Sequence, residues 1–186
     1  LSRSAEEQLA ALGVELRLNC RVKDVRRHAV EGEGVNGPET LRAENIIWAA
    51  GVAAAPVTRA LGVELDRAGR VKVFPDLSVP GFPEVFAIGD LALVSDEDGK
   101  PVPGVSPAAM QMARHVGRVI ERELERGPAK SRPAFRYWDK GTMATIGRSA
   151  AVAKVGDLEF SGLLAWLAWL FIHLLFLVGF RNKAGV

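Results

Sequence analysis

The stretch that decides the fold runs from Glu84 to Gln111 and reads EVFAIGDLALVSDEDGKPVPGVSPAAMQ. Its opening apolar run, residues 85–88, stops at Gly89 and Asp90, which is typical of a buried strand that ends in a turn. Open α/β sheets bind ligands at the carboxyl ends of their strands. Gly89 would let a ligand approach the backbone closely, and the carboxylate of Asp90 can accept hydrogen bonds from sugar hydroxyls. We therefore expect a binding site at this strand end.

A long helix is predicted after the polar loop 95–104. Ser106 suits the N-cap and Pro107 the first helical position, and the amphipathic period continues to Arg126, where Gly127 and a proline end it. The period predicts a buried face made of Ala109, Ala113, Val116, Ile120 and Leu124. The N-terminus of this helix would present unpaired N–H groups, with a partial positive charge, to whatever the strand end holds.

Patterns outside this stretch predict further elements of an α/β chain. They are a helix over 1–12, half-exposed strands over 14–19 and 21–27, a buried strand over 45–50, a short helix after Pro56 and a hairpin over 141–156. Residues 32–37 formally match the nucleotide fingerprint G-x-G-x-x-G, but Pro38 follows them where that fingerprint opens a helix. Because Asn36-Gly37 is a typical hairpin turn, we assign this segment to a hairpin.

Composition excludes several classes of function. The net charge is +2 and the basic residues are scattered, so nothing indicates a nucleic-acid partner. The single cysteine, Cys20, excludes a disulfide framework and a C-x-x-C redox pair. Three scattered histidines and one cysteine match no ligand spacing, so no metal site is expected.

Four stretches resemble motifs of known flavoproteins. VFAIGD followed by a helix resembles the second flavin-binding motif of flavoproteins with two dinucleotide-binding domains. NIIWAAGVAAAP, residues 45–56, resembles the motif at which their chain returns from the nucleotide domain to the flavin domain. The stretches 135–156 and 160–183 narrow the resemblance to type II, non-proton-pumping NADH:quinone oxidoreductases. The resemblance extends from about Val14 to the last residue.

This resemblance implies an α/β fold class: part of a Rossmann-like flavoprotein fold with two dinucleotide-binding domains, followed by a C-terminal apolar, membrane-associating helix. Residues 1–47 would be the end of the NADH-binding domain, 48–158 the C-terminal half of the FAD-binding domain and 159–186 a truncated membrane-seating segment. Both glycine-rich nucleotide fingerprints would lie upstream of Leu1. We therefore expect residues 1–186 by themselves neither to retain FAD nor to oxidise NADH.

The resemblance also implies roles in binding the cofactor. Asp90 matches an aspartate that binds the ribityl chain of FAD, and Gly89 belongs to the same motif. Gly51 would let the crossing strand pass close to the cofactor. The N–H groups of Ala109 and Met110 would face the pyrimidine edge of the flavin, where the positive end of a helix stabilises negative charge by about 0.3–1 kcal/mol.

Two residues are candidates for a part in catalysis. Lys140 matches a lysine beside both the flavin and the quinone, where its charge could stabilise charge that develops on a quinone oxygen. Gln111 is the candidate polar group near the flavin ring, although Pro107 replaces the first glutamine of the A-Q-x-A-x-Q pattern typical of these enzymes. Plain structural roles stay open for four candidates: an N-cap or solvated loop carboxylate at Asp90, a surface glutamine, a solvated turn lysine and, at Gly51, a simple turn.

The apolar tail, residues 163–180, has 18 residues without a formal charge. As a helix it would be about 27 Å long, barely enough for a hydrocarbon core about 30 Å thick. Trp166 and Trp169, with Arg181 and Lys183 beyond them, favour a helix at the membrane interface over a buried core helix or a true span. The resemblance implies peripheral, monotopic attachment to the cytoplasmic face of the inner membrane.

The implied activity is transfer of electrons from NADH through FAD to a membrane quinone, without proton pumping. The cofactors would be FAD and NADH, and the partners a quinone and the membrane surface; a homodimer stays open. Two other functions are left as alternatives: a soluble ferredoxin- or rubredoxin-type NAD(P)H reductase, and a non-catalytic membrane-docking relic.

Overall fold

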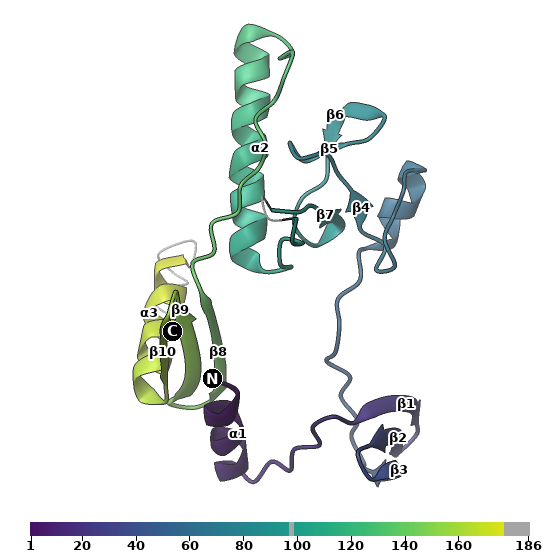
Figure 1. The fold of residues 1–186 in the computed structure, drawn as a ribbon, viewed down its shortest axis with the longest axis vertical. Helices are drawn as coiled ribbons and strands as arrows, with labels where there is room; N and C mark the ends of the chain where they lie inside the picture. The colour runs from purple at the N-terminus through teal and green to yellow at the C-terminus, as the bar shows by residue number, and fades with distance from the viewer. Residues whose placement is uncertain (97–98, 177–186) are drawn as a thin grey trace. The chain divides into compact units, whose positions relative to one another are not determined.

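The computed structural model describes residues 1–96 and 99–176, which belong to two units (Figure 1). One unit is Ala49–Asp139, and the other combines Leu1–Trp48 with Lys140–Val186. Helices and strands occur in both, so the mixed α/β class predicted from the sequence is confirmed. The assignment of residues 1–47, 48–158 and 159–186 to nucleotide-binding domains and a membrane-seating segment stays a prediction.

The unit Ala49–Asp139 carries the stretch that opens the sequence analysis. Its elements are η1 (Pro56–Leu61), β4 (Val71–Lys72), β5 (Ser78–Val79), β6 (Phe82–Phe86), η2 (Gly89–Leu91), β7 (Ala92–Leu93) and α2 (Ser106–Arg126), where η denotes a 3-10 helix. β4 pairs in parallel with β7, and β5 pairs antiparallel with β6. The predicted strand at 85–88 therefore exists only as the end of β6, because its pairing with β5 extends no further than Phe86.

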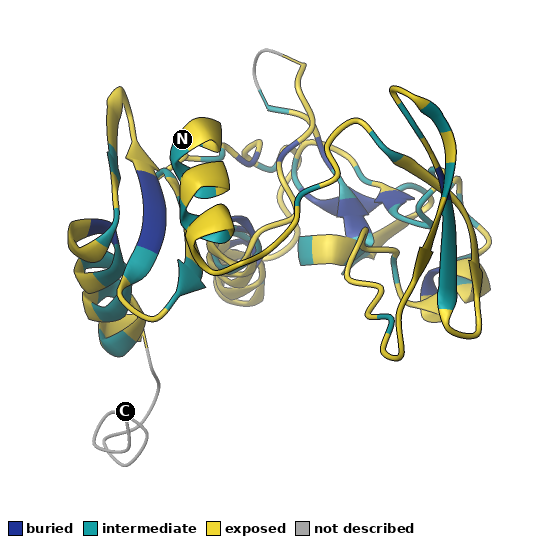
Figure 2. Cartoon of the chain, turned by 90° about the horizontal axis from the view of Figure 1, so that it is seen from below, coloured by how far each residue is buried: buried dark blue, intermediate teal, exposed yellow. Residues whose placement is uncertain are grey.

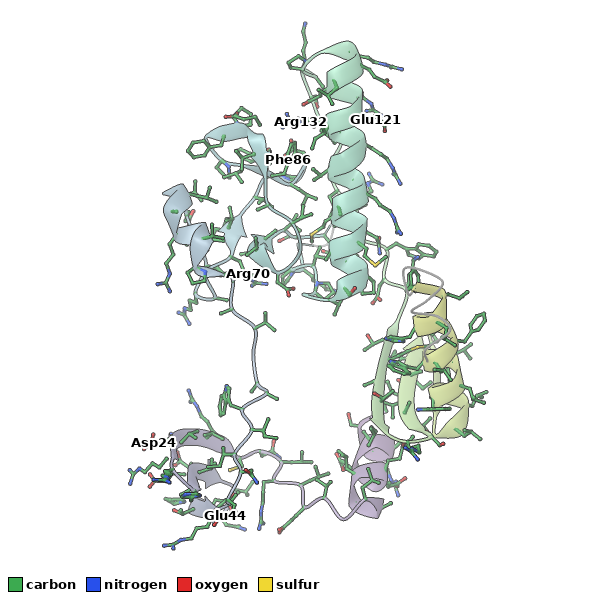
Figure 3. All side chains as sticks on the ribbon, turned by 180° about the vertical axis from the view of Figure 1, so that it is seen from behind. Asp24, Glu44, Arg70, Phe86, Glu121 and Arg132 are labelled. Atoms are coloured by element: carbon green, nitrogen blue, oxygen red, sulfur yellow. The ribbon has the colours of Figure 1, made fainter. Side chains whose placement is uncertain are left out.

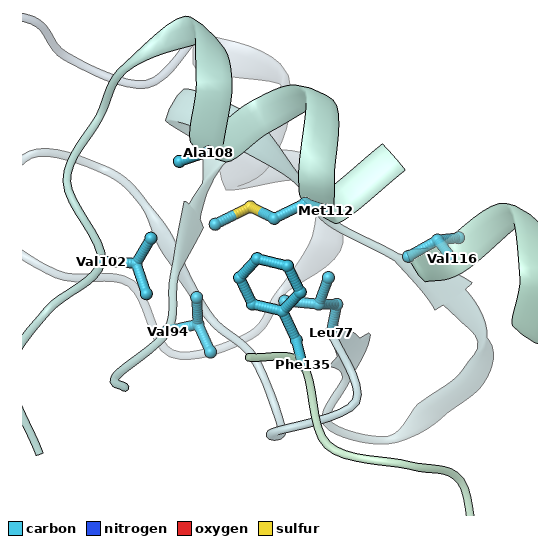
Figure 4. Packing of buried hydrophobic residues seen from close by; sticks show 7 residues of the cluster. All are labelled: Leu77, Val94, Val102, Ala108, Met112, Val116 and Phe135. Atoms are coloured by element: carbon cyan, nitrogen blue, oxygen red, sulfur yellow. The ribbon is translucent and has the colours of Figure 1, made fainter. Parts of the chain in front are cut away.

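α2 packs on the main core of this unit (Figure 4). The buried side chains of this core are Leu77, Val94, Val102, Ala108, Met112, Val116 and Phe135. The predicted range of the helix is confirmed, but the predicted buried face is wrong except at Val116. The buried residues are instead Ala108, Met112, Val116 and Val119, so the core contacts a neighbouring face of the helix, while Ile120 is 44% and Leu124 83% exposed.

The other unit contains α1 (Ser2–Ala11), a sheet of β1 (Arg21–Arg26), β2 (Ala29–Gly34) and β3 (Gly37–Arg42), and a second sheet of β8 (Thr142–Gly147), β9 (Ala150–Val155) and β10 (Leu158–Ser161). Both sheets are antiparallel in sequence order. The predicted hairpins are confirmed: Gly34 pairs with Gly37, and β8 pairs with β9. β1 is exposed along its whole length, and dark blue in Figure 2 marks the buried residues of β9.

Two predicted strands are wrong. Residues 14–19 and 45–50 form no strand, and the side chains of Ile47 and Trp48 are 86% and 62% exposed. A strand needs a partner for its backbone groups, and neither segment has one among the described residues. An apolar run is therefore not sufficient to make a strand.

The apolar tail forms α3, Leu163–Phe176, which packs on β9 through a small core of Ala151, Ala153 and Ala165. Within residues 1–96 and 99–176 no helix is long and apolar enough to cross a membrane. The remainder of the predicted tail helix, with Arg181 and Lys183, lies outside the described residues. Membrane association of the tail therefore stays a prediction.

Candidate functional site

A cleft of about 240 Å³ lies where η2 meets the first turn of α2. Gly89 and Asp90 line it from η2, and Val105, Ala108, Ala109 and Met112 line it from the start of α2. Gly104 and Arg70 also lie on its wall. The strand end and the helix N-terminus that the sequence places 16 residues apart therefore share one cleft.

Gly89 holds this junction together. Its φ is +62°, a left-handed conformation that glycine adopts readily, and a Cβ there would lie 3.3 Å from the Cβ of Ala109. Its N–H donates to the Sδ of Met112, at 3.2 Å, and Met112 is 2% exposed. Only a residue without a side chain leaves both the turn and the close approach of α2 undisturbed.

Asp90 presents an available carboxylate to the cleft. Its side chain is exposed, and no described residue donates a hydrogen bond to it. A Cβ at Gly104 would lie 3.1 Å from its Oδ1, so this glycine also leaves space beside the carboxylate. The chemistry available here is acceptance of hydrogen bonds from hydroxyl groups.

The N-terminus of α2 differs from the sequence prediction. Val105, not Ser106, is the N-cap, and the Ser106 hydroxyl lies 3.9 Å from the Sδ of Met110. The N–H groups of Ala108 and Ala109 donate to the carbonyl of Val105, at 3.0 and 3.1 Å. Ala109 therefore offers no unpaired N–H to a ligand, and what the helix end contributes is the partial charge of its dipole.

Gln111 makes a two-point contact with the backbone of Trp138. Its Nε2 donates to the Trp138 carbonyl, at 2.9 Å, and its Oε1 accepts from the Trp138 N–H, at 3.0 Å. The geometry resembles a pair of strand hydrogen bonds and fixes the segment around Trp138 beside α2. A quinone contact through Gln111, as predicted, would have to compete with these two bonds.

The roles predicted for Lys140 and Gly51 stay predictions. Lys140 is exposed and belongs to the unit that does not contain the cleft. Gly51 is exposed with a φ of +81°, and no heavy atom lies within 4 Å of a Cβ built there. Its sequence neighbour Val52 does line the cleft.

Sequence reasoning missed Arg70, which lines the cleft. Its side chain is labelled in Figure 3. Its Nε donates to Oδ2 of Asp66, at 2.7 Å. Asp66 Oδ1 accepts from the N–H groups of Ala68 and Arg70, at 2.9 and 2.8 Å. The backbone hydrogen bond from Arg70 is the main cause that lowers the pKa of the Asp66 carboxyl. An aspartate followed by Gly69-Arg70 was the sequence signal for this turn, since aspartate often bonds the backbone two residues on.

The groups that line the cleft suit an organic cofactor. It combines one carboxylate, one guanidinium and the end of a helix dipole with apolar side chains. No group of three or more metal-ligating side chains occurs in residues 1–96 and 99–176.

Comparisons with known proteins agree with this chemistry. The sequence matches the family described as pyridine nucleotide-disulphide oxidoreductase over residues 1–113. Over 98% of its length it is 45% identical to a type II NADH:quinone oxidoreductase of Mycobacterium tuberculosis, of which it covers 40%. Over 83% of its length it is 32% identical to a type II NADH:quinone oxidoreductase of Haemophilus influenzae, of which it covers 34%.

Solved structures share the fold. The structure of NDH2 from Plasmodium falciparum in complex with NADH matches 97% of this chain and 52% of its own, with a TM-score of 0.83 and 17% identity. A FAD-dependent pyridine nucleotide-disulphide oxidoreductase from Desulfovibrio vulgaris matches 83% of this chain and 38% of its own, with a TM-score of 0.56 and 23% identity.

The chain spans about 40% of the length of the two Mycobacterium tuberculosis relatives that it matches. The family match covers more than half of its residues. The protein therefore belongs to the pyridine nucleotide-disulphide oxidoreductase family, and along nearly its whole length it is similar to the type II NADH:quinone oxidoreductases.

Proposed function

We propose that this chain is the C-terminal part of a type II NADH:quinone oxidoreductase, which passes electrons from NADH through FAD to a membrane quinone without pumping protons. The observation that carries the proposal is the 45% identity to such an enzyme across 98% of the chain. The family match and the cleft at η2 and α2 also support it.

The residues of the cleft fit one section of a flavin dinucleotide. The carboxylate of Asp90 is available to accept hydrogen bonds from the ribityl hydroxyls, and Gly89 and Gly104 leave the space that this approach requires. Pockets for whole small molecules have volumes of about 300–1,000 Å³, so a cleft of about 240 Å³ suits part of the cofactor. Bound FAD would supply the redox chemistry, by accepting a hydride from NADH and passing two electrons to a quinone.

The surrounding residues position the cofactor and tune its environment. The dipole at the N-terminus of α2 favours negative charge beside it, which is the charge that a reduced flavin carries. Gln111 holds the backbone of Trp138 against α2. In this proposal Lys140 provides a positive charge for the quinone oxygen, Gln111 is the polar group near the flavin ring, and Gly51 lets the chain pass close to the cofactor.

In the same proposal the protein is monotopic: it attaches to the cytoplasmic face of the inner membrane and does not span it. α3 supports this, because apolar side chains lie on its exposed surface as well as on its packed face. The exposed side chains are Leu163, Leu164, Leu167, Phe171, Leu175 and Phe176. We expect the protein to float with liposomes and the double variant Leu167→Glu/Phe171→Glu to remain behind, while Leu158→Glu, an exposed leucine of β10, floats normally. Flotation that the double variant retains would contradict this attachment.

The decisive experiment compares residues 1–186 with the complete polypeptide that carries them. We expect the complete polypeptide to retain close to one FAD per chain and to reduce a short-chain quinone with NADH. Residues 1–186 alone should do neither. A complete polypeptide that retains no flavin would overturn the proposal. Reduction of a ferredoxin or rubredoxin, without reduction of a quinone, would favour a soluble reductase.

Light scattering on the same preparation would show whether the complete polypeptide forms a homodimer.

A further inference from the structure

The cleft contains one cationic side chain, that of Arg70. Among the described residues that line the cleft, no other side chain carries a positive charge. Arg70 comes from the turn Asp66–Arg70, upstream of β4, whereas Asp90 comes from η2. Two segments of the unit Ala49–Asp139 therefore bring a guanidinium and a carboxylate to the same cleft.

The Asp66–Arg70 turn is closed by its own backbone. The N–H of Asp66 donates to the carbonyl of Arg70, at 2.9 Å, and the N–H of Gly69 donates to the carbonyl of Asp66, at 3.0 Å. Thr58, which is 3% exposed, donates its hydroxyl to the carbonyl of Gly69, at 2.8 Å. The base of the Arg70 side chain is thus anchored to η1 and does not depend on a ligand for its position.

Only some of the N–H donors of the Arg70 guanidinium form hydrogen bonds within the protein. Its Nε and Nη2 both lie 2.7 Å from Oδ2 of Asp66, and the Arg70 side chain is 31% exposed. An arginine carries five N–H donors in a planar fork. Two of them point to Asp66, and Nη1 bonds to no described residue. The Asp66 carboxylate therefore orients the fork and leaves donors for an anion.

The usual alternative donor for an anion is weak here. A helix N-terminus binds phosphate through its unpaired N–H groups. In α2, Pro107 has no N–H, and the N–H groups of Ala108 and Ala109 are bonded to Val105. Among the described residues that line the cleft, Arg70 is therefore the cationic donor for an anionic group.

Resting on the proposed function, we infer that Arg70 binds the phosphate next to the ribityl chain of the flavin nucleotide. The carboxylate of Asp90 accepts the ribityl hydroxyls, and the guanidinium donates to the phosphate attached to the same chain. An arginine fork matches the geometry of phosphate oxygens, and a hydroxyl-bearing chain that ends in a phosphate satisfies both charged groups at once. Arg70 is thus a binding residue for the flavin nucleotide, and Asp66 is the residue that positions it.

The test uses three flavins on the complete polypeptide after its flavin has been removed. FAD and FMN carry the phosphate, and riboflavin lacks it. We expect Arg70→Gln to weaken binding of FAD and FMN by about 10- to 100-fold, as for loss of charged hydrogen bonds, and to leave riboflavin binding within about 2-fold. Arg70→Lys keeps the charge without the fork and should fall between wild type and Arg70→Gln.

The matched control is Arg67→Gln, which removes an exposed arginine of the same turn that does not line the cleft. It should leave the affinities for all three flavins within about 2-fold, because surface substitutions are near neutral. Equal weakening of FMN and riboflavin by Arg70→Gln would mean that Arg70 only shapes the turn, and unchanged FMN binding would mean that it touches no phosphate. Either result overturns the inference and leaves the proposed function standing. Wild-type protein that binds no flavin at all would instead overturn the proposed function.

Discussion

The two ends of α2 are built differently. At the C-terminal end, Arg132 bonds both carboxylate oxygens of Glu123, at 2.7 and 2.8 Å, and lies 3.5 Å from Asp76. Its guanidinium also lies 4.9 Å from the centroid of the Phe86 ring (Figure 3). At the N-terminal end no side chain caps the helix, and the carboxylate of Asp90 has no donor among the described residues.

The C-terminal end of α2 therefore contributes to stability, whereas the N-terminal end is available for binding. Each of the three charged side chains at the C-terminal end is less than 20% exposed and satisfied by protein partners. The N-terminal end keeps glycines and an unpaired carboxylate around a cleft. A pre-formed site needs groups that the fold leaves free, and a rigid anchor elsewhere keeps those groups in place. We therefore expect substitutions at the two ends to give different kinds of effect.

The largest effect should come from Arg132→Ala at the C-terminal end. It would leave Glu123 and Asp76 without their cation and remove the contact with Phe86. We expect the free energy of unfolding to fall by about 2–3 kcal/mol, below the range for fully buried pairs because the cluster is partly exposed. Denaturant titration measures this, with Arg122→Ala, an exposed arginine of the same helix, as the control within about 0.5 kcal/mol. Equal effects of the two substitutions would show that the cluster is not an anchor.

Asp90→Asn tests the opposite end. The substitution keeps the size of the side chain and removes its charge, so the free energy of unfolding should change by less than about 0.5 kcal/mol. Affinity for FAD should fall by about 10-fold, since hydrogen bonds to a charged group contribute about 1.5–3 kcal/mol and the amide retains one acceptor. Flavin fluorescence measures the affinity and denaturant titration the stability. A large loss of stability without loss of FAD would remove the distinction between the two ends.

Gly89→Ala should show that the cleft end also has a structural requirement. The φ of +62° is strained for alanine, and the new Cβ would meet that of Ala109 at 3.3 Å. We expect a loss of about 1 kcal/mol or somewhat more. Gly62→Ala is the matched control, because Gly62 has a φ of +66° and no heavy atom within 4 Å of a Cβ. The difference between the two substitutions isolates the contact with α2, and no difference would mean that backbone strain alone matters.

The smallest effect concerns pH. The hydrogen bonds from Arg132 hold the pKa of the Glu123 carboxyl below its usual range. Because the folded pKa is depressed, the stability that this pair contributes is present above the unfolded pKa of about 4.3 and is lost as the pH falls through the folded pKa. Unfolding curves measured between pH 7 and pH 3 should therefore show a steeper loss for wild type than for Glu123→Gln. Parallel curves would show that this pair does not contribute.

Sequence reasoning succeeded where the signal is local. Asn36-Gly37 predicted the turn between β2 and β3, although the two turn residues are Val35 and Asn36, and α2 follows from an amphipathic period that Gly127 ends. It failed where partners are distant in sequence. Residues 45–50 have a strand's composition but no partner strand among the described residues, and which face of α2 is buried depends on where the core meets the helix.

The candidate site shows the same division. Gly89 and Asp90 could be identified from the sequence because they directly follow an apolar run that ends in a turn. Open α/β sheets bind ligands at the carboxyl ends of their strands. The contact of Gln111 with Trp138 and the presence of Arg70 in the cleft could not be identified from the sequence, since they join residues 27 and 20 positions apart.

The sequence by itself determined the family, the turns, the extent of α2 and the strand end with its carboxylate. Residue types with restricted backbone conformations and regular apolar spacing encode such features locally. Only the tertiary structure decided which polar groups are already bonded and which remain free: Ala109 and Gln111 are engaged by the fold, whereas Asp90 and part of the Arg70 fork are not. Hydrogen-bond satisfaction is a property of packed neighbours, and those neighbours exist only once the chain has folded.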